Sequence, residues 1–280
     1  MENLIYNISS SHRDKNKYPD ANNFELILPS TIKNITYLKL TSVEFPYVFY
    51  NYQENRNNTS FNLKHTNNTI TDTIIINDGN YTNTQLINTM TTKLNEINSL
   101  RSTNFSISLS DITKRLTFTN DTEFTLDFSR MGNRQYDGIN YSLGFKNNSY
   151  TGTSIAGDSV INTGGCRYFF VKINKLDNIY DNNVTNCFAK ILLNSSVYNT
   201  RYEGNDSFVS KTKQFRKPEN FNKLTFEFVD EHNNLIEFGT HNISLTVELG
   251  YIYDIKLYHQ IHNNGIPNGD NRLKYLYHNR

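Results

Sequence analysis

The chain has 280 residues, of which 36 % are hydrophobic and 13 % are aromatic, and it carries a formal net charge of +1. This length allows one large domain or two modest ones, and the 19 Tyr and 18 Phe can supply a core where aliphatic residues are few. The near-neutral net charge shows no excess of Lys and Arg of the kind that nucleic-acid-binding proteins carry. No run of 18 or more apolar residues indicates a membrane span.

Residues 1–22 are polar and predict an N-terminal arm. The start, MENLIYNISSSHRD, lacks the basic leader and apolar block of a secretion signal. Arg13, Asp14 and Tyr18 lie in this arm, where we find no alternating pattern and no cap for the strand that follows. Ordering such a segment costs about 1–2 kcal/mol per residue in backbone entropy, so we expect it to order against a neighbouring subunit.

Strand patterns dominate the rest of the chain. They are short apolar or alternating runs, often ended by Pro, and the 44 Asn of the sequence favour the turns between them. The predicted strands are 24–29, 35–46, 71–78, 105–110, 115–120, 123–128, 168–173, 188–193, 223–229, 235–238 and 243–252. Such spacing predicts an all-β fold, an antiparallel sandwich or barrel.

The alternation within these runs also predicts which side chains face the core. Ten residues from both halves of the chain are expected to be buried. They are Leu38, Leu40, Val43, Phe169, Val171, Ile191, Leu224, Phe226, Leu245 and Val247.

One segment has helical periodicity. Leu86, Met90, Leu94 and Ile97 follow at steps of four, four and three, and Thr82 or Thr84 is placed to cap the start.

The helix interrupts the strands, and a Gly/Ser/Thr-rich stretch follows it, so we predict an inserted unit. The predicted domains are an N-terminal arm (1–22), a β-sandwich (23–67 and 165–256), an inserted strand–helix–strand subdomain (68–164) and a C-terminal tail (257–280).

Residues that could carry chemistry are scattered. His259 and His262 form an H-x2-H pair near the C-terminus, with Asp270 as one further ligand candidate, which is a weak metal signal. Cys166 and Cys187 have no metal-ligand spacing and are expected to be reduced thiols.

Four carboxylates, Asp177, Asp181, Asp230 and Glu231, lie beside Asn in predicted turns, where a turn-forming role is favoured over catalysis. No Gly-x-Ser-x-Gly elbow, Walker loop or H-E-x-x-H motif is present. The sequence therefore predicts no enzyme, no metal and no cofactor.

The stretch SSHRDKNKYPDANNFELILPSTIKNITYLKLTSVEFP, residues 10–46, resembles the N-terminus of minor virion proteins of nucleocytoplasmic large DNA viruses. INDGNYTNTQLINTMTTKLN, with RLTFTN and SLGF after it, is similar to a Gly-x-Tyr-Thr-helix segment of these proteins. KLTFEFVDEHNNLIEFGTHNISLTVEL is similar to their closing pair of strands, except that Asn233 and Asn234 stand where Gly is commoner. The matching residues of the first stretch are Ser11, Arg13, Asp14, Tyr18, Pro19, Phe24, Leu28, Pro29, Asn34, Leu40, Ser42, Val43, Glu44 and Pro46.

The resemblance covers roughly residues 9–252 in three patches. It implies a jelly roll with an inserted small α+β subdomain, acting as a penton or minor capsid protein in the virion, assembled in the host cytoplasm. The implied partners are other copies of the chain, which a single jelly roll would join as a pentamer, together with the major capsid protein and other minor capsid proteins.

Arg13, Asp14, Tyr18, Tyr275 and Tyr277 are the predicted interface residues. A receptor- or glycan-binding β-sandwich on the virion surface is the alternative, and a hydrolase built on a β-sandwich is a third hypothesis.

Overall fold

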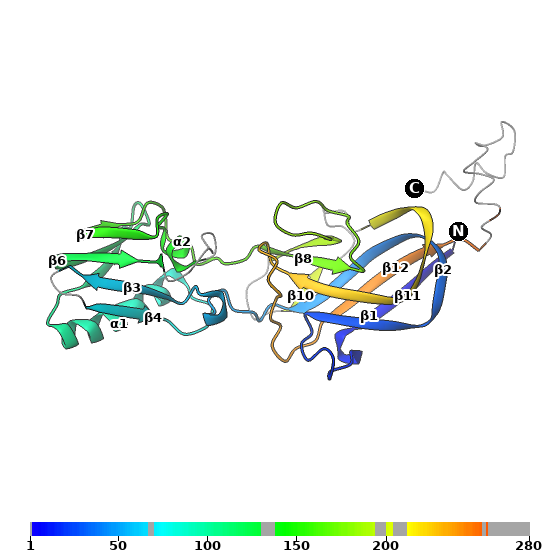
Figure 1. Ribbon diagram of the computed structural model, residues 1–280, viewed down its shortest axis with the longest axis horizontal. Coiled ribbons are helices and arrows are strands. Elements are labelled where there is room, and N and C mark those ends of the chain that lie inside the picture. Colours follow the sequence, from blue (N-terminus) through cyan, green and yellow to red (C-terminus); the bar gives the residue numbers. More distant parts are fainter. Residues whose placement is uncertain are drawn as a thin grey trace, which may run out of the picture. The chain divides into compact units, whose positions relative to one another are not determined.

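The structure is a computed structural model that describes residues 2–66, 70–129, 138–193, 200–203, 212–253 and 256. Two compact units divide the chain, the first made of Met1–Val48 with Tyr168–Arg280 and the second of Phe49–Arg167. Each unit is built around a β-sheet, and all strand pairings within the described residues are antiparallel (Figure 1). The predicted fold class, an all-β antiparallel sandwich with a helix-bearing unit in the middle of the chain, is confirmed.

The first unit contains a seven-stranded sheet in the order β1-β12-β2-β11-β8-β9, with β10 paired to the end of β2. The order brings the two ends of the unit together, because β12 lies between β1 and β2. The strands are β1 (Glu2–Ser9), β2 (Asn23–Pro46), β8 (Tyr168–Ile173), β9 (Ala189–Leu192), β10 (Thr200–Glu203), β11 (Thr212–Val229) and β12 (Ser244–Tyr251).

Aromatic rings form the core of this unit. β2 and β11 are long curved strands (Figure 1), and Phe24 near the start of β2 stacks on Phe226 of β11 at 5.2 Å between ring centroids. Phe45, near the other end of β2, meets the edge of Phe169 of β8 at 4.8 Å although these strands are not neighbours in the sheet. The curved sheet therefore closes over its own rings, as a sandwich requires.

All ten residues predicted for this core are at most 1 % exposed, which confirms the prediction.

A β-bulge explains why Leu40 and Val43, three residues apart, both face this core. Leu40 pairs with Val247 and Ser42 with Thr246, so Thr41 is an extra residue on β2. Its hydroxyl donates to the carbonyl oxygen of Thr246 at 2.9 Å. The extra residue shifts the alternation by one and keeps both apolar side chains on the inner face.

The prediction of an N-terminal arm is wrong for residues 2–9, because these residues form strand β1. This strand pairs with β12 along its whole length, from Glu2 opposite Tyr251 to Ser9 opposite Ser244. Leu4, Tyr6 and Ile8 occupy alternate positions, and Ile8 is only 2 % exposed. Pairing with β12 supplies backbone hydrogen bonds that offset the entropy of ordering, and so no second subunit is needed.

The second unit is a five-stranded sheet in the order β4-β3-β6-β5, with β7 also paired to β6. Its strands are β3 (Ser60–His65), β4 (Thr71–Ile75), β5 (Ser106–Leu109), β6 (Leu116–Asp127) and β7 (Ser149–Ala156). The helices are α1 (Asn83–Arg101) and α2 (Ile139–Leu143), and two 3-10 turns, η1 (Ser10–His12) and η2 (Glu54–Arg56), lie in the first and second units respectively.

The border between the units differs from the predicted one. We expected residues up to 67 in the sandwich, but β3 pairs with β4 and β6 of the small sheet. Phe61 and Leu63 of β3 are fully buried in the same core as helix α1. Because β3 and β4 form a hairpin with one buried face, the segment 49–67 belongs with the second unit.

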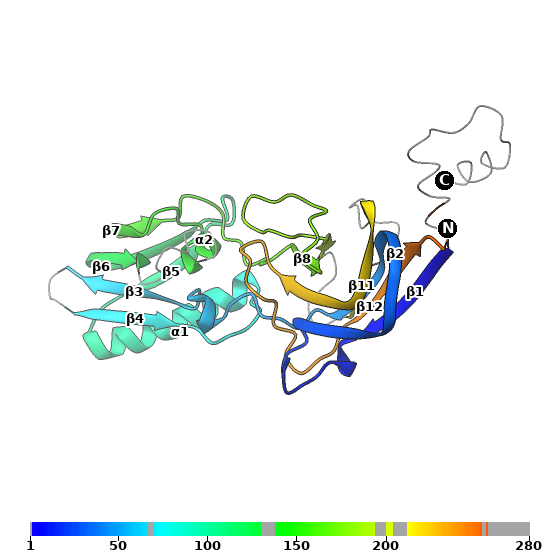
Figure 2. The same cartoon turned by 45° about the vertical axis from the view of Figure 1, so that its right-hand side comes forward.

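Helix α1 confirms the helical prediction. Leu86, Met90 and Leu94 are fully buried and Ile97 is 8 % exposed, all in the core that α1 shares with the sheet (Figure 2). At its start Thr82 accepts a hydrogen bond from the Gln85 backbone N–H at 3.2 Å, and the Gln85 side chain accepts from the Thr82 N–H at 2.9 Å. This reciprocal capping box makes Thr82 the N-cap, which is the first of the two predicted candidates.

Candidate functional site

The predicted interface residue Arg13 fixes the loop between β1 and β2. Its Nε donates to the carbonyl oxygen of Tyr18 at 2.9 Å and its Nη2 to that of Pro19 at 2.6 Å. Nη1 donates to the Ser10 carbonyl oxygen at 2.8 Å and to Oδ1 of Asn242 at 2.9 Å. A planar guanidinium can join several acceptors at once, and here it ties the loop to the chain just before β12.

Asp14 and Lys17 stabilise the same loop. Oδ1 of Asp14 accepts from the N–H of Asn16 at 3.0 Å and of Lys17 at 3.3 Å, which is an Asx turn. Lys17 lies 4.9 Å from the ring centroid of Tyr18 and 3.7 Å from Oε1 of Glu25. The Asp14 side chain is exposed and Tyr18 is half-buried, so parts of both reach the surface.

The two other predicted interface residues, Tyr275 and Tyr277, lie outside the described residues, as do His259, His262 and Asp270.

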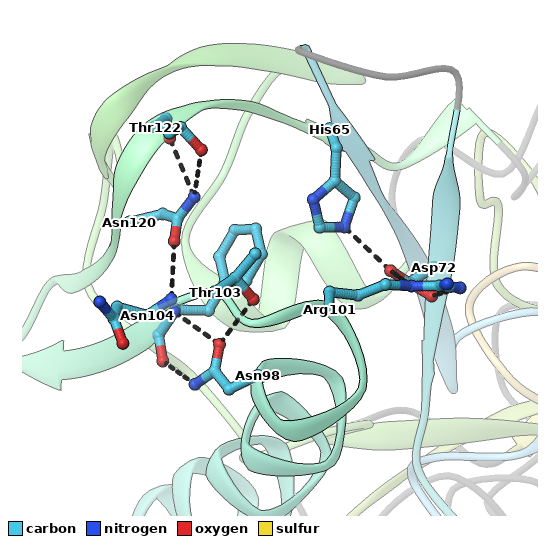
Figure 3. A network of polar contacts seen from close by, with 9 residues as sticks. His65, Asp72, Asn98, Arg101, Thr103, Asn104, Asn120 and Thr122 are labelled. Atoms are coloured by element: carbon cyan, nitrogen blue, oxygen red, sulfur yellow. Dashed lines mark hydrogen bonds and ion pairs between the residues drawn. The ribbon is translucent and has the colours of Figure 1, made fainter.

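The second unit contains a polar cluster that the sequence did not predict, drawn in Figure 3. Nε2 of His65, on β3, lies 2.9 Å from Oδ2 of Asp72, on β4. Arg101, the last residue of α1, donates from Nη2 to Oδ1 of Asp72 at 3.0 Å and from Nε to Oδ2 at 3.3 Å. The side chains of His65 and Asp72 are only 7 % and 10 % exposed. One carboxylate therefore joins the β3–β4 hairpin to the end of the helix.

The electrostatics of Asp72 follow from this geometry. Burial by itself would raise its pKa, but the hydrogen bonds from Arg101 and His65 outweigh burial and lower the pKa of Asp72. The ring of His65 packs edge-on against Phe105 at 5.3 Å. An Asp–His pair can activate a nucleophile, but this imidazole packs on the core and this carboxylate is shared with an arginine. The cluster fits a structural role.

Beside it, amide side chains fix the end of helix α1 (Figure 3). Oδ1 of Asn98 accepts from the Phe105 N–H at 2.7 Å and the Thr103 hydroxyl at 3.0 Å, and Oδ1 of Asn120 accepts from the Asn104 N–H at 3.2 Å. These bonds satisfy backbone groups in the turn after the helix.

The first unit has a small polar pocket of about 60 Å³. Its walls are tied to other protein groups: Nζ of Lys172 donates to Oδ1 of Asn233 at 2.7 Å, and Oδ1 of Asn174 accepts from the Thr225 N–H at 2.8 Å. The pocket is far below the roughly 300–1,000 Å³ of small-molecule sites. Its lining residues are Lys172, Asn174, Lys175, Asn186, Thr225 and Glu227.

Two of the four carboxylates considered for acid–base chemistry, Asp181 and Asp230, form turns as expected, whereas Asp177 bonds to a residue nine positions along the chain. Asp177 accepts from the Asn186 N–H at 2.8 Å, and Asp181 accepts from the Val184 N–H at 3.0 Å. Asp230, 1 % exposed, accepts from the backbone N–H of Asn234 at 2.8 Å.

Neither Cys166, which is half-buried, nor Cys187, which is buried, forms a disulfide. Burial raises the pKa of the Cys187 thiol to about 11, which opposes formation of a nucleophilic thiolate.

Among the described residues no group of three or more His, Cys, Asp or Glu side chains is placed to hold a metal ion. None of their helices is long and apolar enough to cross a membrane.

The described chain is thus an antiparallel all-β protein whose polar clusters fix turns and the ends of elements. It belongs to a family described as "Family of unknown function (DUF5901)", which matches residues 1–217. No curated protein matches the sequence. Among solved structures, the chain is similar to a selenomethionine-labelled mavirus penton protein, with 11 % sequence identity and a TM-score of 0.48, over 90 % of this chain and 100 % of that one.

Proposed function

We propose that the chain is a structural component of an icosahedral capsid of a nucleocytoplasmic large DNA virus, a penton or minor capsid protein that makes subunit–subunit contacts. The observation that carries this proposal is the ordered resemblance of three stretches within residues 9–252 to minor virion proteins of these viruses. The virion is then its location. Other copies, the major capsid protein and other minor capsid proteins are its partners.

The positions of the matching residues support the proposal. Arg13 donates hydrogen bonds to the carbonyl oxygens of Tyr18 and Pro19, and Leu40 and Val43 fill the sandwich core. The shared pattern therefore specifies a framework, namely a loop held to the chain just before β12 and followed by a long strand.

The polar clusters described above support a non-enzymatic role. His65 and Arg101 both bond to Asp72, and Lys172 and Asn174 of the small polar pocket bond to other protein groups. A protein whose function is to contact other subunits needs such polar clusters only to keep its fold rigid. We propose that exposed Asp14, half-buried Tyr18, Tyr275 and Tyr277 contact neighbouring subunits, while Arg13 acts within its own loop.

The proposal is tested by locating the chain in the virion. Mass spectrometry of purified particles is expected to detect it at a fixed ratio to the major capsid protein. An electron-microscopy map of the particle is expected to hold the two units, each fitted separately, at the five-fold vertices or beneath the shell. Absence of the chain from washed particles would overturn the capsid role. Specific binding on a glycan array, with density only on the outer surface, would favour the receptor-binding alternative.

A further inference from the structure

Strand β1 lies at one end of the seven-stranded sheet, beside β12 (Figure 2). Within the described residues it pairs with β12 alone, over eight residue pairs and without a register shift. An edge strand of this length presents a row of backbone groups that another strand can bind.

Hydrogen bonding beyond the end of β1 shows which of its backbone groups face outward. The Ser10 N–H donates to the Ile243 carbonyl oxygen at 2.9 Å, immediately after the pair formed by Ser9 and Ser244. Residues of an antiparallel strand alternate between facing one neighbour and the other. The even-numbered residues of β1 therefore bond to β12, and the N–H and C=O groups of Asn3, Ile5 and Asn7 face away from the sheet.

The opposite side of β12 agrees with this assignment. The carbonyl oxygens of Thr246 and Gly250 accept hydrogen bonds from the hydroxyls of Thr41 and Thr36 on β2. The backbone N–H and C=O groups of the even-numbered residues of β12 thus point toward β2. Those of its odd-numbered residues point toward β1, where they lie opposite the even-numbered residues of β1.

The side chains of β1 do not protect the edge. Ile5 is 68 % exposed, on the same face as exposed Asn3 and Asn7. Edge strands are commonly blocked by Lys, Pro or bulges, and β1 has none of these. Glu2, at its end, is the one side chain charged at neutral pH, and its Oε2 accepts from the Tyr251 hydroxyl at 2.5 Å.

We propose that β1 pairs antiparallel with β1 of a second copy of this chain, with Ile5 opposite Ile5 and Asn3 opposite Asn7. Outward-facing groups then meet outward-facing groups, and the exposed isoleucines cover each other. Glu2 comes opposite Ile8, so like charges are not opposed. If the pairing were shifted toward the C-terminus of β1, the partner strand would run into the turn η1. If it were shifted toward the N-terminus, fewer residues would pair.

The contact is isologous, since the same strand of both copies forms it around a two-fold axis. The pairing deepens the proposed function and rests on it, because it depends on the assembly in which that function places the chain. A single pair of short strands is smaller than the interfaces that hold stable dimers, so the pairing needs the high local concentration of an assembly. A two-fold contact of this kind suits a minor capsid protein beneath the shell better than a five-fold ring.

The register can be tested by cysteine cross-linking of the concentrated, purified full chain, with Cys166→Ser as the background. Residues opposite each other in such a pair have Cα atoms about 5.5 Å apart, which suits a disulfide. Ile5→Cys is expected to give cross-linked dimers on mild oxidation. Asn3→Cys and Asn7→Cys are each expected to stay monomeric alone and to cross-link when mixed. Equal cross-linking of Asn3→Cys alone and Ile5→Cys would overturn the register.

A second measurement uses the unaltered chain. Residue-resolved amide hydrogen exchange at rising protein concentration should increase protection at Asn3, Ile5 and Asn7. Protection at Leu4 and Tyr6 should stay the same, because β12 already binds their N–H groups. Uniform change, or none, would overturn the pairing.

Failure of this inference differs from failure of the proposed function. If the chain is present in particles but Ile5→Cys gives no dimer, the edge of β1 does not pair with β1 of a second copy in this register. The pairing is then refuted while the capsid role stands. If Ile5→Cys cross-links but the chain is absent from particles, the pairing stands and the capsid role fails.

Discussion

Replacing Phe226 by alanine tests whether the aromatic core holds the first unit together. Phe226 is fully buried on β11, pairs with Phe24 of β2 and Ile173 of β8, and stacks on the Phe24 ring at an interplanar angle of 29°. Removing a buried Phe side chain costs about 3–5 kcal/mol, because apolar burial is lost and a cavity remains. A domain is stable by only about 5–15 kcal/mol, so this loss should be plainly measurable.

The assay has to separate the two units, because they can unfold in separate transitions. Hydrogen exchange resolved by peptide, followed along a urea series, reports each unit by itself. The control is Ile27→Ala on β2, whose side chain is 76 % exposed, with an expected change within about 0.5 kcal/mol. A loss below about 1 kcal/mol for Phe226→Ala would refute the burial argument, as would an equal loss for both variants. Loss of protection in the second unit would refute the independence of the units.

Three further changes test other features. Gly250→Ala would place its Cβ 2.0 Å from a ring carbon of Tyr37; such overpacking should cost about 1–3 kcal/mol in thermal melts, and an unchanged melt would contradict the contact. The lowered pKa of Asp72 gives stability that is fully present above the unfolded-state value of 3.8 and is lost as pH falls through the folded-state value. Asp72→Asn should therefore weaken the second unit near neutral pH and flatten its acid destabilisation, and an unchanged pH profile would contradict this. Replacing residues 49–167 by a short Gly/Ser linker should leave the sandwich folded, because loop entropy changes slowly with length; an insoluble product would contradict separate folding.

Local periodicity made the helix and the sandwich core predictable. The stripe from Leu86 to Ile97 repeats at helical spacing, and the buried residues of β11 and β12 alternate as strands do. Each pattern is contained within a single element, so no knowledge of its neighbours was needed.

The rest depends on contacts between distant residues. β1 was taken for an arm because Asn and Ser lie among its apolar residues, and its partner β12 is more than 230 residues away. The cluster of His65, Asp72 and Arg101 joins two strands and a helix end, and no short motif marks it. Arg13 looked like an interface residue, whereas its partner Asn242 is at the other end of the chain.

The abundance of Asn has a physical explanation in the turns. Eight non-glycine residues of the described chain have positive φ, and five of them are Asn, which tolerates the left-handed region better than most residues. Asn34, Asn57, Asn174, Asn186 and Asn233 allow tight turns without glycine, while Phe and Tyr fill the cores between them. The polar side chains of the turns and element ends thus fix where strands and helices end, and the apolar cores hold these elements together. Binding of a partner then depends on the surfaces that the fold exposes. In the described part of the first unit, the unprotected edge of β1 is one such surface, and its regular backbone allows a second strand to pair in one register.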